Sequence, residues 1–430
     1  MRSVASFALG CKVNQVESEA IAEAFAEKGY KIVGIDEKAD IYVINTCTVT
    51  NFGDKKSRQL IRRVKRQNPD SIVVVAGCYA QTAAEEIKKI DGVNIVMGTK
   101  GRNSVVDEVE KYSFENGIVD TVGDIMYEKV FEPISIHKLM GRTRAYIKIQ
   151  DGCSQFCSYC IIPYARGPVR SRKEEDIIKE VEMLASNGFK EVVLTGIHAA
   201  SYGKELHTTN LLELIKKVHD VNGIERIRTS SIEPNIITED FMTELSSLSK
   251  VCRHFHLSLQ SGCNRTLKAM NRKYTVEKYY NAVEIIRKYW PDAALTTDII
   301  VGFPGETEED FAESYAFAEK VGFSKIHVFP YSPKKGTPAA EMEGQIPPDI
   351  KEKRAEALIR LSNEMAGRFI SGFVGKNVEV LFEQRPKEGY FEGHTSNYIN
   401  VIVKSDDDIR NKILSVNIKS AENEKAFGEI

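Results

Sequence analysis

The chain has 430 residues, of which 42% are hydrophobic and 28% charged, a composition typical of a globular protein with room for about three domains. A formal net charge of −2 excludes a global attraction to nucleic acid or to anionic membranes, so any such contact must come from local basic patches. No apolar run approaches the roughly 20 residues of a membrane span, and the short apolar piece before Lys12 is too short for a signal peptide. We therefore expect a cytoplasmic protein without membrane contact.

The first hundred residues alternate between short apolar runs and amphipathic stretches. This pattern predicts strands at 3–9, 30–35, 40–46, 71–77 and 93–98, and helices at 16–29, 52–69 and 82–90. Such alternation indicates an α/β fold with a parallel sheet covered by helices, which we assign to an N-terminal domain at 1–112.

Three cysteines stand just after predicted strands of this domain, namely Cys11, Cys47 and Cys78. The carboxyl ends of parallel strands line one edge of a sheet, where ligands bind. Residues 36 and 31 positions apart in sequence can therefore converge. Three purely structural thiols would not be expected to share this placement.

Residues 113–140 have a looser pattern and are predicted to be a connecting segment. A second alternating series then predicts strands at 144–150, 191–197, 226–232, 254–260, 295–303 and 325–331, separated by helices. Six or so such units suggest a partial parallel (β/α) barrel at 141–370, with functional residues at the strand carboxyl ends. The period-two pattern after Gly372 predicts a small antiparallel β-barrel at 371–430.

The stretch DGCSQFCSYC places Cys153, Cys157 and Cys160 in one loop directly after a predicted barrel strand. Disulfides fit poorly, because a large chain without an export signal is expected in a reducing compartment. Structural zinc normally takes four protein ligands, although a zinc loop stays an alternative. A [4Fe–4S] cluster held by three cysteines keeps one iron free to bind a substrate or cofactor.

This loop resembles the C-x3-C-aromatic-x-C loop of radical S-adenosylmethionine enzymes, with Tyr159 at the aromatic position. The resemblance implies that S-adenosylmethionine chelates the open iron and yields a 5′-deoxyadenosyl radical. It further implies that Tyr159 lies near the adenine and that Thr195 and Gly196 contact the methionyl amino group. The remaining expected contacts to ribose, carboxylate and adenine come from later strand ends, namely Ser230, Ser231, Gln260, Ile300 and Gly302. Turn chemistry alone could also account for Gly196 and for the GFPGET stretch.

Together with GCKVNQVESE, NTCTVTN and AGCYAQ, the loop and its continuation CIIPYARGPVRSR resemble the methylthiotransferases over nearly the whole chain. The resemblance implies a second [4Fe–4S] cluster on Cys11, Cys47 and Cys78, a C-terminal TRAM-like RNA-binding module, and CH3–S insertion into an unreactive C–H bond. The stretches TGIHAASYG and HLSLQSGCNRTLKAMNRKYT are most similar to the branch that modifies N6-threonylcarbamoyladenosine next to the anticodon in tRNA. The implied partners are a tRNA anticodon stem-loop, an electron donor protein and a sulfur source.

Two other methylthiotransferase substrates and one protein without catalytic activity remain as alternatives. A methylthiotransferase could act on isopentenyladenosine in tRNA or on an aspartate of a ribosomal protein, and a zinc-stabilised RNA-binding protein would have no chemistry at all.

Local basic runs at 54–66 and 166–173 suit phosphate binding, although such runs are often only solvated helix faces. The C-terminal module has eight basic and ten acidic residues, so RNA contact there would use a basic face or aromatic stacking by Phe382, Tyr390, Phe391 or Tyr398.

For three further pairs of residues the sequence gives less specific expectations. Arg228 and Glu233 could pair at the barrel rim or contact the cofactor. Cys252 and Cys263 are expected to be buried apolar thiols, and His254 with His256 a satisfied polar pair inside the barrel.

Overall fold

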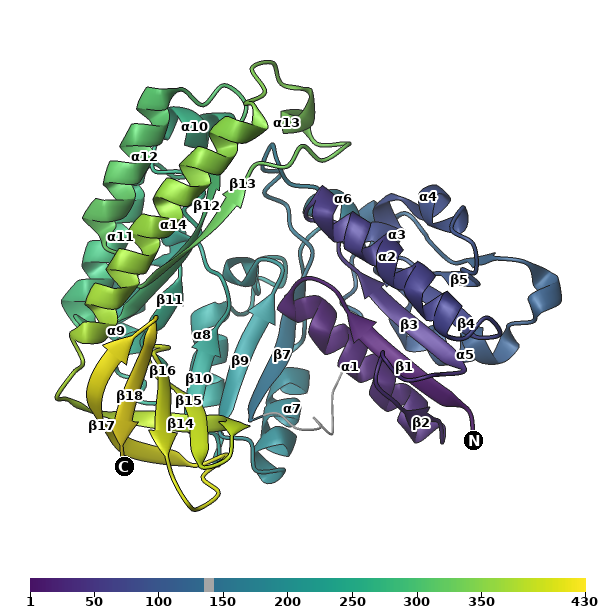
Figure 1. Ribbon diagram of the computed structural model, residues 1–430, viewed down its shortest axis with the longest axis horizontal. Coiled ribbons are helices and arrows are strands. Elements are labelled where there is room, and N and C mark those ends of the chain that lie inside the picture. Colours follow the sequence, from purple (N-terminus) through teal and green to yellow (C-terminus); the bar gives the residue numbers. More distant parts are fainter. Residues whose placement is uncertain (135–142) are drawn as a thin grey trace.

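The computed structural model describes residues 1–134 and 143–430. Figure 1 shows an N-terminal α/β part, a central open barrel and a small C-terminal β-barrel. The predicted boundary between the connecting segment and the barrel domain, at residues 140 and 141, lies outside the described residues. Among the helices that are described, none is long and apolar enough to cross a membrane.

The N-terminal part is a six-stranded sheet in the order β2-β1-β3-β4-β5-β6, with every neighbouring pair parallel. The strands are β1 (Ser3–Ala8), β2 (Lys31–Ile32), β3 (Ile41–Thr46), β4 (Ile72–Gly77), β5 (Ile95–Val96) and β6 (Val119–Asp120). Helices α1 (Lys12–Glu27) and α5 (Val105–Lys111) cover one face, and α2 (Asn51–Gln67), α3 (Cys78–Thr82) and α4 (Ala84–Lys88) the other. The predicted parallel α/β architecture is confirmed, and β6 comes from the predicted connecting segment.

The central part is a partial barrel built from two sheets, in the orders β10-β9-β7-β8 and β11-β12-β13. Isolated bridges from Ile227 to Val251 and from Ile232 to Leu257 join them between β10 and β11. The strands are β7 (Arg144–Asp151), β8 (Arg170–Ser171), β9 (Glu191–Gly196), β10 (Arg226–Thr229), β11 (His254–His256), β12 (Ala294–Val301) and β13 (Lys325–Pro330). Within the described residues β7 and β13 do not pair, so the barrel is open on that side, as predicted.

Helices follow the barrel strands, and all but the two short helices α6 and α13 bury apolar residues in one continuous core. They are α6 (Ile162–Arg166), α7 (Glu174–Ser186), α8 (Leu211–His219), α9 (Glu239–Ser246), α10 (Asn264–Ala269), α11 (Val276–Tyr289), α12 (Glu308–Val321), α13 (Pro338–Glu341) and α14 (Pro348–Ser371). Helix α14 leads directly into the C-terminal barrel.

The C-terminal part is a closed barrel in the order β14-β15-β16-β18-β17. Its strands are β14 (Asn377–Lys387), β15 (Tyr390–Thr395), β16 (Asn400–Lys404), β17 (Ile413–Glu422) and β18 (Lys425–Glu429). The predicted small barrel is confirmed, with one difference: β16 and β18 pair in parallel, and every other pair is antiparallel.

Candidate active site

Three neighbouring strands place Cys11, Cys47 and Cys78 at one edge of the N-terminal sheet. Cys11 precedes the first residue of α1, Cys47 directly follows β3, and Cys78 begins α3 after β4. The backbone at Gly10 passes so close to Cys47 that a Cβ atom on Gly10 would lie 2.5 Å from the Cβ of Cys47. Gly10 also has a φ of 97°, a conformation that favours glycine. We call these three residues the first cysteine tripod.

The three residues of the first tripod differ in burial: Cys11 is exposed, Cys47 is partly buried and Cys78 is buried. Burial raises the pKa of the Cys47 thiol to about 12, and the nearby Cys78 and Cys11 add to this effect. Burial also raises the pKa of Cys78, whereas Arg166 opposes that shift. Soft thiolates that crowd together in this way suit a metal cluster, which replaces the thiol protons when it binds.

A buried guanidinium links this tripod to the barrel. Arg166, at the end of α6, donates from Nε to the Sγ of Cys78 at 3.2 Å. The same side chain donates to Oε1 of Glu17 at 2.6 Å and to Oδ1 of Asn14 at 2.5 Å. Glu17 and Asn14 belong to α1, so one side chain of the barrel part is fixed by two elements of the N-terminal part.

A buried network of charges around Glu17 lies beside the first tripod. Four buried cations, Arg102, Lys148, Arg166 and Arg170, surround three carboxylates, Glu17, Asp151 and Glu132. Arg166, a member of this network, donates to the Sγ of Cys78 and would stabilise a thiolate there, so the residues present fit an iron–sulfur cluster.

The second tripod, Cys153, Cys157 and Cys160, lies in the loop after β7. Gly152 makes the loop possible, because its φ is 74° and a Cβ there would lie 1.8 Å from the carbonyl oxygen of Pro168. Burial raises the pKa of Cys153 to about 11 and that of Cys160 to about 12. The Sγ of Cys157 accepts a hydrogen bond from Nη1 of Arg272 at 3.2 Å. Each tripod thus has one thiol paired with a guanidinium, which stabilises a thiolate.

The structure places the N-terminal part and the second tripod around one cavity of about 240 Å³. Val49 and Thr50, which follow Cys47, line one side, and Tyr159 and Cys160 line the other. Gln260 and Ile300, two of the expected cofactor contacts, also line it, with Asp298, Phe329 and Tyr331 among the remaining residues.

The other expected contacts to S-adenosylmethionine lie at strand ends around the cavity without lining it. Thr195 is buried and Gly196 packs on Gln150, whereas Ser231 is exposed. The hydroxyl of Ser230 is buried and lacks a hydrogen-bond partner within the described chain, which leaves it available to a bound molecule. The amide of Gly302 already donates to Glu306, so its structural role is to complete a turn.

Arg228 and Glu233 do not pair with each other. Arg228 pairs with Glu191 at 2.8 Å and donates to the carbonyl of Ser396 in the C-terminal barrel. Glu233 pairs instead with Arg272 at 2.8 Å, so it holds the guanidinium that contacts Cys157. Sequence reasoning missed the roles of Arg166 and Arg272, because their thiol partners lie 88 and 115 positions away.

The basic run at 166–173 was expected either to bind phosphate or to be a solvated helix face, and its arginines are placed for neither. Arg166, Arg170 and Arg172 are buried, and each pairs with a carboxylate of the protein. Their charges are therefore compensated by carboxylates inside the protein. The run at 54–66 behaves differently, since five of its basic residues are exposed along α2: Lys55, Lys56, Arg62, Arg63 and Arg66.

Most of the expected RNA-stacking aromatics of the C-terminal barrel are also unavailable. Phe382 and Phe391 are in its core. Tyr398 stacks on His254 with ring centroids 4.8 Å apart and so docks the small barrel onto the central one. Tyr390 stays partly exposed, under the ammonium of Lys387. As expected, Cys252 and Cys263 are buried.

Comparisons with known proteins agree with this geometry. Residues 147–318 match the Radical SAM superfamily, and residues 3–98 match an uncharacterized protein family, UPF0004. The chain is 45% identical to the threonylcarbamoyladenosine tRNA methylthiotransferase MtaB of Bacillus subtilis (strain 168), over 98% of this chain and 94% of the relative. It is 37% identical to the tRNA-2-methylthio-N(6)-dimethylallyladenosine synthase of Acetivibrio thermocellus, over 98% and 89%.

Solved structures share the fold at low sequence identity. The radical S-adenosylmethionine methyltransferase TsrM from Kitasatospora setae superposes with a TM-score of 0.57 at 15% identity, covering 79% of this chain and 77% of that one. The radical enzyme OxsB superposes with a TM-score of 0.52 at 13% identity, covering 86% and 56%. On the near full-length similarity to curated relatives, the chain belongs to the radical S-adenosylmethionine methylthiotransferases, transferases that use S-adenosylmethionine and two [4Fe–4S] clusters.

Proposed function

We propose that this enzyme adds a methylthio group to N6-threonylcarbamoyladenosine next to the anticodon of tRNA, in the cytoplasm. A relative named for this substrate is 45% identical, whereas relatives named for the dimethylallyl substrate are 37% and 39% identical. The observation that carries the proposal is the cavity between Thr50 and Cys160, because sulfur insertion requires both centres to reach one nucleoside.

We assign one [4Fe–4S] cluster to each cysteine tripod: Cys11, Cys47 and Cys78 for the first, and Cys153, Cys157 and Cys160 for the second. Each tripod offers three thiolates, so each cluster keeps one iron open to a non-protein ligand. When bound, the second cluster supplies the electron that cleaves S-adenosylmethionine, which also requires an electron donor protein. The first tripod is the place where a sulfur source delivers the inserted atom.

The side chains around the second tripod orient the cofactor. Tyr159, Gln260 and Ile300 line the cavity. Tyr159 and Ile300 offer S-adenosylmethionine an apolar surface, and Gln260 offers a side-chain amide for hydrogen bonding. The free hydroxyl of Ser230 would gain a hydrogen-bond partner from the bound cofactor. Arg272, held by Glu233, keeps Cys157 in its ligand position.

Helix α2 is the best-supported surface for the tRNA backbone. It begins at Asn51, next to the cavity residue Thr50, and its exposed face is basic. Lysine and arginine on such a face bind phosphates without reading sequence, so binding should weaken steeply with salt. Tyr390 with Lys387 offers a second, smaller contact on the C-terminal barrel.

The test uses anaerobically reconstituted enzyme, S-adenosylmethionine, a reductant and tRNA that carries threonylcarbamoyladenosine. We expect nuclease digests to show the mass of one added methylthio group on that nucleoside. The Cys157→Ala variant should lose 5′-deoxyadenosine formation, whereas Cys47→Ala should keep it and lose sulfur insertion. Cys252→Ala, a buried thiol outside both tripods, is the matched control. Full modification of dimethylallyladenosine with none of threonylcarbamoyladenosine would overturn the substrate assignment, and a colourless zinc protein would overturn the chemistry.

A further inference from the structure

The inner face of β11, β12 and β13 carries a strip of polar side chains next to the cavity. Asp298 on β12 is the direct register partner of His327 on β13, and His256 on β11 is the partner of Thr296. Alternate residues of a strand share one face, so Thr296 and Asp298 point to the same side as the cavity residue Ile300. Asp298 itself lines the cavity and joins it to the strip.

The strip is held in a defined geometry. Nδ1 of His256 lies 3.0 Å from Oγ1 of Thr296, and Nε2 lies 3.3 Å from Oδ2 of Asp298. The nitrogen and oxygen atoms that His256, Asp298 and His327 can offer lie within 4.8 Å of one another. Three polar groups from three strands thus converge on one point, which a single small polar ligand could reach.

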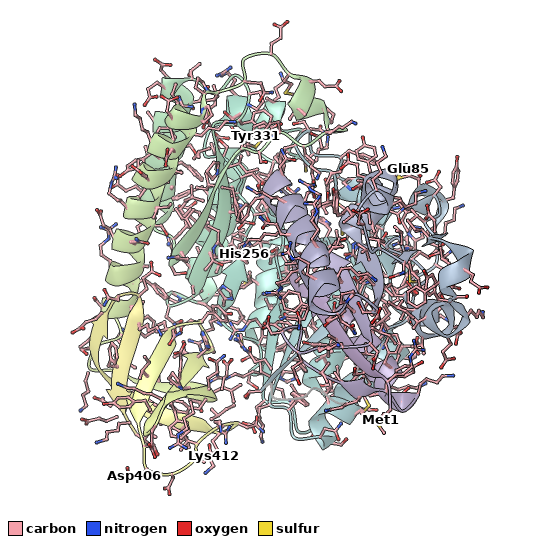
Figure 2. All side chains as sticks on the ribbon, turned by 45° about the vertical axis from the view of Figure 1, so that its right-hand side comes forward. Met1, Glu85, His256, Tyr331, Asp406 and Lys412 are labelled. Carbon is pink, nitrogen blue, oxygen red and sulfur yellow. The ribbon has the colours of Figure 1, made fainter. Side chains whose placement is uncertain are left out.

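This strip borders open space and not the barrel core. The side chains of His256 and Asp298 are 15% and 29% exposed, and His327 is exposed although it points to the inner face. Figure 2 shows His256 below the cavity residue Tyr331 and toward the middle of the molecule. The barrel interior is therefore accessible here, on the side where β13 leaves it open.

The cluster offers both donors and acceptors of hydrogen bonds, because an imidazole donates from its ring N–H and the carboxylate of Asp298 accepts. Burial lowers the pKa of His327, which favours the neutral imidazole that donates one hydrogen bond and accepts another.

We propose that this strip is the site that recognises the polar side chain of the substrate nucleoside, with the imidazole of His327 donating to its carboxylate and Asp298 accepting from its hydroxyl. The inference rests on the proposed function, since a threonylcarbamoyl group has a carboxylate, a hydroxyl and urea N–H groups. A dimethylallyl group is a hydrocarbon and would leave the strip without partners. A site built from hydrogen-bonding groups rejects a ligand that lacks the matching groups, so the strip determines which modified adenosine is accepted.

The test measures binding of three anticodon stem-loop RNAs to cluster-loaded enzyme by fluorescence anisotropy under anaerobic conditions. The RNAs carry threonylcarbamoyladenosine, dimethylallyladenosine or unmodified adenosine and are otherwise identical. The variant is His327→Leu, which replaces an exposed imidazole and so preserves the core. The control is His219→Leu, on α8 outside the barrel interior, and equal iron content and melting temperature verify the fold of each variant.

Wild-type enzyme should bind the threonylcarbamoyl RNA most tightly. His327→Leu should weaken that binding by about ten-fold to a hundred-fold and leave the other two RNAs and the His219→Leu control unchanged. If wild-type enzyme prefers the threonylcarbamoyl RNA and His327→Leu keeps the full preference, the strip is not the recognition site, although the proposed function stands. A wild-type enzyme that binds and modifies only the dimethylallyl RNA would overturn the proposed function itself. Binding of one equivalent of Mn²⁺ that His327→Leu abolishes, with RNA preference intact, would assign the strip to a metal and overturn the inference.

Discussion

Replacing Arg166 with glutamine should destabilise the contact between the N-terminal part and the barrel. The side chain of Arg166 is fully buried, with Glu17 at 2.6 Å, Asp151 at 3.3 Å and Cys78 at 3.2 Å. Removing one partner of a buried ion pair leaves an uncompensated charge and costs about 3–5 kcal/mol. Because Lys148 still contacts Glu17 at 2.8 Å, we expect the free energy of unfolding to fall by an amount near the lower end of this range, about 3 kcal/mol.

The assay is urea unfolding of cluster-free protein, followed by the fluorescence of Trp290, the single tryptophan, and by circular dichroism. Trp290 is buried in the central barrel, so its signal separates unfolding of this part from unfolding of the whole chain. A loss of about 3 kcal/mol lowers the midpoint by about 1 M urea for a slope of about 3 kcal/mol/M. A separate measurement of iron after reconstitution should show poorer occupancy of the first tripod.

The matched control is Arg63→Gln, which removes an arginine from a surface ion pair with Asp36. These side chains are 48% and 83% exposed, and such pairs contribute at most about 1 kcal/mol. If Arg166→Gln and Arg63→Gln shift the midpoint equally, the buried network does not stabilise the interface, and the reasoning from burial and charge fails.

Three further outcomes follow from the geometry. Gly10→Ala should lose the iron of the first tripod, because its Cβ would meet Cys47 at 2.5 Å, whereas Gly29→Ala, with no atom within 4 Å, should keep it; iron analysis distinguishes them. Burial by itself would raise the pKa of Glu17, but the neighbouring cations lower it to about 2, so its stabilising contribution is complete above pH about 4.5 and is lost as pH falls toward 2. Urea midpoints across that window should fall more steeply for wild type than for Glu17→Gln, and parallel curves would contradict the assignment. Ser230→Ala should leave unfolding unchanged, because its hydroxyl has no partner in the described chain, yet weaken S-adenosylmethionine binding in equilibrium dialysis; unchanged affinity would remove Ser230 from the cofactor site.

Much of the candidate site could be predicted from local sequence. The spacing of Cys153, Cys157 and Cys160 defines a ligand loop by itself, since three thiols within eight residues converge whatever surrounds them. Cys47 and Cys78 could be placed together because parallel strands end at the same edge, and β3 and β4 are indeed neighbours. These predictions depend on the spacing of the cysteines and on the direction of the predicted strands, and both can be inferred from short segments of sequence.

The burial of the arginines at 166–172 and the length of the strand at 254–260 depended on which segments pack together in the folded chain. The arginines at 166–172 look like a solvated basic patch, yet α6 packs on α3 and β8 pairs with β7, which buries Arg166 and Arg170 with Glu17 and Asp151 as partners. The predicted strand at 254–260 is only His254–His256, because the chain beyond makes just isolated bridges, from Leu257 to Ile232 and from Gln260 to Ile299 of β12. Sequence periodicity cannot report either outcome, since it describes one segment and not its neighbour.

The sequence by itself thus determined the kinds of elements, the two sets of thiols and the chemistry that thiolates allow, because these follow from residue type and short-range spacing. The tertiary structure alone decided that Arg166 and Arg272 each contact a tripod thiol, and that His256, Asp298 and His327 share one open face. Both arrangements join side chains from segments far apart in the chain. Their energies come from burial and Coulomb interactions that exist only once those segments pack together.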